Sequence, residues 1–224
     1  MDQLLWLLDS RLQVFGSEIL WREIVGNAFG FASAVGGLRR RVWAWPIGIV
    51  GNILLFTVFL GGVFATPQAK DLYGQAGRQV FFLAVSAYGW WRWHRNAELG
   101  PAVTPRWASA RERLQLAGLI VASMAVFYVT LRALGSWGPL ADAWILTGSL
   151  LATYSMARGY VEFWLIWIAV DLVGVPLLLK AGFYPSALLY AAYGVFCVIG
   201  FLAWRRVQRL EERVAPEVEV AASP

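Results

Sequence analysis

VEFWLIWIAVDLVGVPLLL, at residues 161–179, is the stretch that decides the fold. It is apolar along nearly its whole length, and a helix that spans a bilayer needs about 20 such residues. Asp171 stands in its middle, where insertion of a carboxylate into a membrane costs roughly 2.5–3.5 kcal/mol. A polar group retained at that cost is a functional candidate. The stretch therefore predicts a membrane-crossing helix that carries a functional carboxylate.

Six further apolar segments surround this stretch, and each is long enough, or nearly so, to cross a bilayer. The seven expected transmembrane helices are Trp21–Leu38, Val42–Phe64, Gln75–Trp93, Leu114–Leu134, Ala143–Ala157, Val161–Leu179 and Ser186–Trp204.

The composition agrees with a membrane protein and argues against several other classes. Of the 224 residues 59% are hydrophobic and 15% charged, whereas a soluble domain has about 25% charged residues. The basic residues occur in short clusters between apolar runs, which is a topology signal and not a nucleic-acid surface. With one Cys, one His and no phosphate-binding loop, we expect no catalytic residues, no metal site and no cofactor. A membrane-embedded enzyme and a structural membrane protein are the alternatives to a solute carrier.

Two terminal segments lie outside the expected helices. Leu5, Leu8, Leu12 and Phe15 recur at helical spacing and predict an amphipathic helix that lies on the membrane, with a disordered start as the alternative. The chain after Arg213 is acidic and rich in small residues, and we expect it to be disordered.

The positions of the basic residues predict the orientation. Most of them follow the first, third, fifth and seventh helices. Since cytoplasmic loops carry an excess of Lys and Arg, the N-terminus is expected outside and the C-terminus in the cytoplasm. Glu162 is expected to pair with Arg158, four residues earlier. The resulting segments are 1–20 (amphipathic N-terminal segment), 21–93 (first triple-helix bundle), 94–134 (basic loop and linker helix), 143–204 (second triple-helix bundle) and 205–224 (cytoplasmic tail).

An internal repeat relates the two bundles. Arg39, Trp45 and Asn52 recur 119 positions later as Arg158, Trp164 and Asp171, and Gln79, Gly89 and Trp93 correspond to Tyr190, Gly200 and Trp204 at an offset of 111. One helix intervenes, so both triplets enter the membrane in the same direction. We therefore predict an all-α integral membrane protein with seven transmembrane helices, as two parallel triple-helix bundles joined by a linker helix (3+1+3).

Polar and aromatic residues at mid-membrane depth are the candidate solute site, because solute sites of repeat transporters lie there. Trp164, Trp167 and Asp171 share one helical face, and Trp faces can stack on a flat ring or hold a cation. Structural hydrogen bonds between helices are the alternative role for the polar members. The candidate substrate-binding residues are Trp164, Trp167, Asp171, Asn52, Gln79, Trp45, Tyr190 and Tyr154.

The order and spacing of several short motifs resemble the PnuC family of B-vitamin transporters. The motifs are Trp45-Pro46-Ile47-Gly48, Gln79, Tyr88-Gly89-Trp90, Glu162 with Trp164, Trp167 and Asp171, and Tyr190. The resemblance implies a multi-pass protein of the bacterial inner membrane with a fold related to SWEET transporters. It also implies energy-independent uptake of nicotinamide riboside, trapped inside the cell by phosphorylation.

Departures from the family pattern leave the ligand open. The motif typical of nicotinamide riboside carriers at this position resembles Glu-Asn-Trp, whereas this chain has Glu162-Phe163-Trp164. Thr153 likewise stands where a Gln is typical of those carriers. Members of the family that have Phe-Trp at the positions of Phe163-Trp164 resemble riboflavin transporters. Nicotinamide riboside is the first expectation, with riboflavin or another flat-ring vitamin such as thiamine as the alternative. The expected partners are the vitamin and the lipid bilayer, without nucleic acid; a homo-oligomer stays open.

Overall fold

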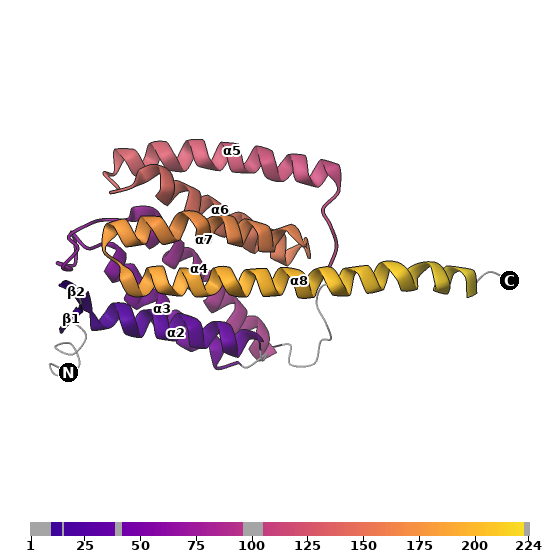
Figure 1. Cartoon of the computed structure of the whole chain (residues 1–224), viewed down its shortest axis with the longest axis horizontal. Helices are drawn as coiled ribbons and strands as arrows, with labels where there is room; N and C mark the ends of the chain where they lie inside the picture. Colours follow the sequence, from indigo (N-terminus) through magenta and orange to yellow (C-terminus); the bar gives the residue numbers. More distant parts are fainter. Residues whose placement is uncertain (1–9, 15, 39–41, 96–104, 222–224) are drawn as a thin grey trace.

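The computed structural model describes residues 10–14, 16–38, 42–95 and 105–221 of the chain. This part contains a two-stranded hairpin followed by seven helices (Figure 1). The elements are β1 (Arg11–Val14), β2 (Ser17–Leu20), α2 (Trp21–Leu38), α3 (Ala44–Phe59), α4 (Tyr73–Arg95), α5 (Ala110–Ala133), α6 (Pro139–Ala157), α7 (Glu162–Ala181) and α8 (Tyr184–Ala221).

The N-terminal hairpin replaces the amphipathic helix expected there. β1 and β2 pair antiparallel, and the Arg11 guanidinium lies 2.8 Å from the Glu18 carboxylate. Between the strands Gly16 has φ +80°, a conformation that glycine adopts without steric cost. The helix prediction is therefore wrong over residues 11–20, because a tight turn at Gly16 lets the strands pair. The other residues on which it rested lie outside the described part of the chain: Leu5, Leu8 and Phe15.

The helices otherwise lie close to their predicted ranges, with one large exception. α2 begins and ends as predicted, and α5 begins at Ala110 because Ser109 and Glu112 form a reciprocal capping box. α8 continues to Ala221, beyond its expected end at Trp204, so the prediction of a disordered tail after Arg213 is wrong over residues 214–221. Arg, Gln, Leu and Glu have high helix propensity, so the polar sequence after residue 204 extends the helix away from the bundle (Figure 1).

The helices pack mainly on their sequence neighbours. α3 packs between α2 and α4, α7 packs between α6 and α8, and α5 packs on α6. Contacts of α4 with α6 and of α2 with α8 join the two groups of helices. The largest apolar core lies between these groups and includes Phe59, Leu72, Ile145, Leu178 and Phe183.

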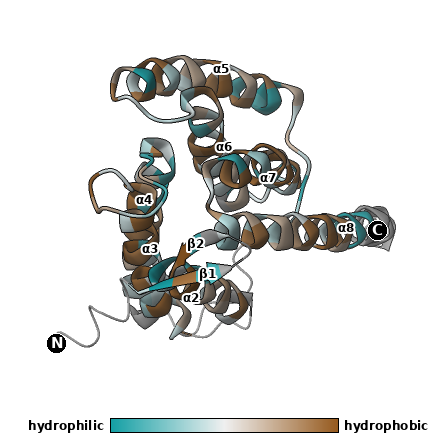
Figure 2. Ribbon diagram, turned by 60° about the vertical axis from the view of Figure 1, so that its left-hand side comes forward, coloured by the Kyte–Doolittle hydropathy of each residue, from teal (hydrophilic) through white to brown (hydrophobic). Residues whose placement is uncertain are grey.

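Many large apolar side chains of the bundle are exposed, and the helices consist largely of hydrophobic residues (Figure 2). Leu114, Leu172 and Leu188 each expose more than 70% of their surface, which would be unfavourable in water but suits contact with lipid. Within the described residues, Ala110–Ala133, Glu162–Ala181 and Tyr184–Arg209 are long and apolar enough to cross a membrane, and Ala44–Phe59 is apolar but shorter. The structure is that of a helical membrane protein.

Candidate functional site

Helix α4 brings three buried polar side chains to the interface between the two groups of helices. Arg78 and Gln79 follow Gln75 by three and four residues, so both lie next to it on one side of the helix. The start of α4 is held by Asp142 of α6, whose carboxylate accepts hydrogen bonds from the backbone N–H groups of Gly74 (2.6 Å) and Gln75 (2.8 Å).

Asp171 of α7 lies near this polar group. It is buried, and the positive charge of Arg78 acts on its carboxylate. Gly194 of α8 leaves space beside it, since a Cβ at that position would lie 3.7 Å from Asp171 Oδ2. One turn earlier on α7, Trp167 stacks on Phe82 of α4, with ring centroids 6.1 Å apart and an interplanar angle of 30°.

Tyr190 of α8 completes the group. Its hydroxyl donates a hydrogen bond to Gln75 Oε1 (2.9 Å), and its ring lies 4.9 Å from the Arg78 guanidinium carbon. The ring also packs directly on Gly174 of α7, where a Cβ would overlap it. Side chains from α4, α7 and α8 therefore converge at one place between the two groups of helices.

Several buried polar atoms of this region make no hydrogen bond within the described residues. They are Gln75 Nε2, Arg78 Nε, Gln79 Nε2 and Asp171 Oδ2. Most buried polar groups in native proteins are hydrogen-bonded, and each one left unpaired is costly. A set of unpaired donors with one unpaired carboxylate oxygen matches a polar ligand that has both acceptors and donors.

The structure separates the predicted site residues into three sets. Trp167, Asp171, Gln79 and Tyr190 belong to the central group described above. Trp164 is packed in an aromatic cluster, 4.3 Å from the Phe163 ring centroid. The remaining members of the predicted set lie away from these contacts: Trp45 packs over Gly89, Asn52 is half-buried on α3, and Tyr154 is exposed beside α5.

Arg78 is the residue of this site that the sequence analysis missed. It was assigned no role from the sequence, although a charge within a membrane-spanning segment is itself a signal of function. Its position three residues after Gln75 and one before Gln79 places it within the predicted third helix. The cost of burying a guanidinium could therefore have identified it from the sequence.

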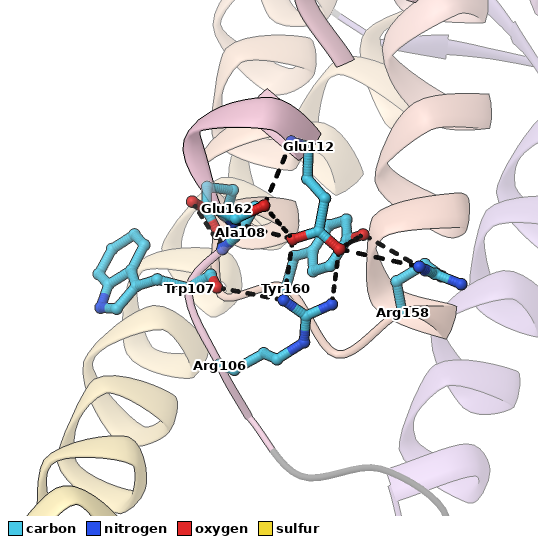
Figure 3. Close-up of polar contacts among 8 residues, drawn as sticks. Arg106, Trp107, Ala108, Glu112, Arg158, Tyr160 and Glu162 are labelled. Atoms are coloured by element: carbon cyan, nitrogen blue, oxygen red, sulfur yellow. Dashed lines mark hydrogen bonds and ion pairs between the residues drawn. The ribbon is translucent and has the colours of Figure 1, made fainter. Parts of the chain in front are cut away.

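A second polar cluster lies at the junction of α5, α6 and α7 (Figure 3). Glu162 accepts hydrogen bonds from the Ala108 N–H and from Arg113 Nε, the latter at 2.8 Å. The predicted Glu162–Arg158 pair is wrong, because Arg158 turns instead toward the Tyr160 hydroxyl (3.3 Å). The partners of Glu162 come from the linker before α5 and from the first turn of α5, which a local spacing rule cannot detect.

Glu112 is the centre of this cluster. Arg106 binds both of its carboxylate oxygens, at 2.8 and 2.9 Å, and the Tyr160 hydroxyl donates to it at 2.7 Å. Hydrogen bonding to Glu112 raises the pKa of the Arg106 guanidinium above its ordinary value, so the pair stays ionised at physiological pH. A groove of about 460 Å³ beside it, lined by Glu112, Tyr154 and Tyr160, opens between α5 and α6. Its lining residues lie outside the central group, and we assign this cluster to fixing α5 against the second group of helices.

Comparison with known proteins decides the family. The profile described as "Nicotinamide mononucleotide transporter" matches residues 20–206. The chain belongs to this family. The predicted PnuC-type resemblance is thereby confirmed, and with it a multi-pass helical membrane protein whose relatives are transporters.

Relatives and a solved structure of the family extend over most of the chain. The chain is 35% identical to the riboflavin/roseoflavin transporter RibM of Streptomyces davaonensis, over 93% of this chain and 95% of the relative. It is 25% identical to the nicotinamide riboside transporter PnuC of Escherichia coli, over 84% and 87%. The crystal structure of the vitamin B3 transporter PnuC superposes with a TM-score of 0.64 at 22% identity, covering 84% of this chain and 82% of that one, which supports the fold.

Proposed function

We propose that this chain is a facilitator that carries a flat-ring B vitamin into the cell, with the ligand held at Asp171. The single observation that carries the proposal is the buried polar group from α4, α7 and α8, in which three side-chain N–H groups of α4 and one carboxylate oxygen of Asp171 find no hydrogen-bond partner in the described part of the chain. The relatives that share the fold carry nicotinamide riboside or riboflavin, and both ligands combine a flat ring with a hydroxylated chain.

The proposed architecture is the 3+1+3 arrangement, with α2–α4 and α6–α8 as parallel bundles and α5 as the linker. Its support is a matched pair of contacts. Trp45 packs with its indole on Gly89, and Trp164 packs in the same way on Gly200. The two tryptophans are 119 positions apart and the two glycines 111, which are the offsets of the sequence repeat. Equal contacts at equal offsets are expected of a pseudo-two-fold axis between the bundles.

The proposed orientation puts the N-terminus outside the cell and the C-terminus in the cytoplasm of a bacterial inner membrane. Arg106 and Arg158 lie close together at one end of the bundle (Figure 3), where Arg113 pairs with Glu162, and the polar extension of α8 projects beyond the bundle toward the C-terminus (Figure 1). Clustered arginine at one membrane surface favours that surface as the cytoplasmic one.

In the proposed site the vitamin binds among Trp167, Asp171, Gln79 and Tyr190, with Arg78 as a further member. Asn52 and Trp45 of α3 and Trp164, earlier on α7, would border the path, whereas Tyr154 faces the outer groove. Transport follows alternating access, in which the two bundles rock about the central site. The carrier uses no energy of its own, and phosphorylation of the vitamin inside the cell keeps it there.

Nicotinamide riboside and riboflavin make different demands on this site. Only the riboside carries a ring cation, which Asp171 could accept and Arg78 would repel. Riboflavin has a neutral ring edged with carbonyl oxygens, which are acceptors for guanidinium N–H groups. The unpaired Arg78 Nε and the 35% identity to a riboflavin carrier favour riboflavin, and the family profile and the E. coli relative favour the riboside.

A competition assay tests the site and the ligand together. A ligand that binds the native state raises the apparent melting temperature in a concentration-dependent way. The melting temperature of the purified protein is therefore measured in the presence of riboflavin, nicotinamide riboside or thiamine. We expect stabilisation by one of the first two, lost in Asp171→Ala. Normal binding and uptake by a folded Asp171→Ala protein would disprove the site.

A further inference from the structure

Two buried carboxylates outside the proposed ligand contacts join the two groups of helices at the end of the bundle that carries the hairpin. Glu23 of α2 accepts hydrogen bonds from the backbone N–H (3.1 Å) and the hydroxyl (2.8 Å) of Ser186, the third residue of α8. Asp142 of α6 accepts hydrogen bonds from the backbone N–H groups of Gly74 and Gln75, the second and third residues of α4. Each carboxylate thus crosses from one group to the other.

The two contacts solve the same structural problem. The first N–H groups of a helix need an acceptor, which a polar residue at the N-cap commonly provides. Here the residues that precede α4 and α8 are Leu72 and Phe183, which are apolar and fully buried and offer no side-chain acceptor. A carboxylate from the opposite group of helices therefore caps each helix, and its negative charge also suits the positive end of the helix dipole.

The two contacts are also equivalent in sequence. Asp142 follows Glu23 by 119 positions, and Ser186 follows Gln75 by 111, which are the two offsets of the internal repeat. The pseudo-two-fold axis that relates the bundles therefore exchanges one contact with the other. We propose that Glu23 and Asp142 are twin latches that hold this end of the transporter closed, and that both must release for the central site to open there.

Each latch can break without leaving backbone N–H groups unpaired. Water can satisfy the N–H groups of Gln75 and Ser186 once the end opens, so breaking a latch does not leave orphaned donors. Within the described residues Glu23 Oε2 is buried without a hydrogen-bond partner, which makes the closed state less favourable than a fully paired carboxylate would. Asn27 adds a hydrogen bond to the Ser186 hydroxyl (3.0 Å), and Ser136 adds one to Asp142 (2.6 Å), so both latches are reinforced locally.

A distance measurement across this end tests the latches without any ligand. Spin labels are placed at Val63 and Leu140, which are exposed on the first and second groups of helices, in a Cys197→Ser background. We expect Glu23→Gln, Ser186→Ala and Asp142→Asn each to raise the ratio of open to closed distances several-fold. Because two separate contacts add in free energy, the Glu23→Gln/Asp142→Asn double variant should multiply the two single effects.

The matched control is Glu18→Gln, a charge at the same end whose partner Arg11 lies within the same hairpin. It should leave the distance ratio unchanged. Ser186→Ala weakens the same contact but keeps the Glu23 carboxylate. It therefore still tests the latch if the Glu23→Gln variant does not fold. Unchanged distances in folded Glu23→Gln, Asp142→Asn and double variants would overturn the latches.

The latches rest on the proposed transport function, but the two can fail separately. If the distances shift as expected and no vitamin is bound or carried, the twin latches stand and the ligand assignment falls. If wild type carries a vitamin while the variants keep the wild-type distances and rates, transport stands and the latches are wrong.

Discussion

Gly89 and Gly200 should not tolerate alanine, because each supports the indole of a tryptophan. A Cβ at Gly200 would lie 2.6 Å from Cζ2 of Trp164, and one at Gly89 would lie 2.7 Å from Cζ2 of Trp45. These separations are well below van der Waals contact, and the rigid rings are themselves packed in the bundle. Overpacking of this kind costs about 1–3 kcal/mol.

Because the overlap is severe, the overpacking cost falls in the upper half of that range, about 2–3 kcal/mol. A helical Gly→Ala change by itself gains roughly 0.5–1 kcal/mol, so the expected net loss is about 1–2 kcal/mol at each position. For a chain of this size that corresponds to a fall in melting temperature of roughly 2–8 °C. The assay is thermal unfolding of the purified protein in detergent, followed by tryptophan fluorescence. Gly118→Ala on α5 is the matched control, since a Cβ there meets no atom within 4 Å, and it should melt at or slightly above the wild-type temperature.

The twin contacts also make a comparative prediction. If the pseudo-two-fold axis relates them, Gly89→Ala and Gly200→Ala should destabilise the protein by similar amounts. The reasoning would be refuted if both variants melted like Gly118→Ala, because the indoles would then not rest on these glycines. A large loss at only one position would refute the equivalence of the two bundles.

Three further changes probe the frame around the site by thermal unfolding. Tyr160→Phe removes a buried donor to Glu112 and should cost about 1 kcal/mol; an unchanged melting temperature would contradict that hydrogen bond. Gly182→Ala places a side chain at φ +88° after α7 and should cost about 1 kcal/mol or more, so a gain in stability would be inconsistent with this helix end. Glu162→Gln weakens a solvent-accessible pair with Arg113 and should cost under about 1 kcal/mol; a loss of several kcal/mol would show a larger role.

The apolar segments could be predicted from the sequence because the length and hydropathy of a segment indicate a membrane helix. The repeat could be predicted because polar and aromatic residues recur at fixed offsets. Trp21–Leu38 begins and ends as predicted. The offsets of 119 and 111 also relate the contact of Trp45 with Gly89 to that of Trp164 with Gly200, which the sequence alone could not show. The N-terminal hairpin was missed because the spacing of Leu5, Leu8 and Leu12 also fits a helix, and the pairing of β1 with β2 depends on the turn at Gly16.

Contacts between distant helices were beyond sequence reasoning. Glu23 and Asp142 stand at the starts of helices, where an acidic residue is ordinary, and nothing local indicates that each caps a different helix. The same holds for Glu162, whose partner Arg113 lies on α5 and not one turn away. Arg78 is the exception, since its charge within an apolar segment was visible and was assigned no role.

Flux into sealed liposomes tests the central claim most directly. The purified protein is reconstituted without ATP or an ion gradient, and uptake of labelled riboflavin and nicotinamide riboside is followed to equilibrium. The account predicts saturable entry of one vitamin until its concentrations inside and outside are equal, with entry lost in Asp171→Ala and retained in Glu18→Gln. Flux no greater than in protein-free liposomes for both vitamins, or accumulation above the outside concentration, would contradict it.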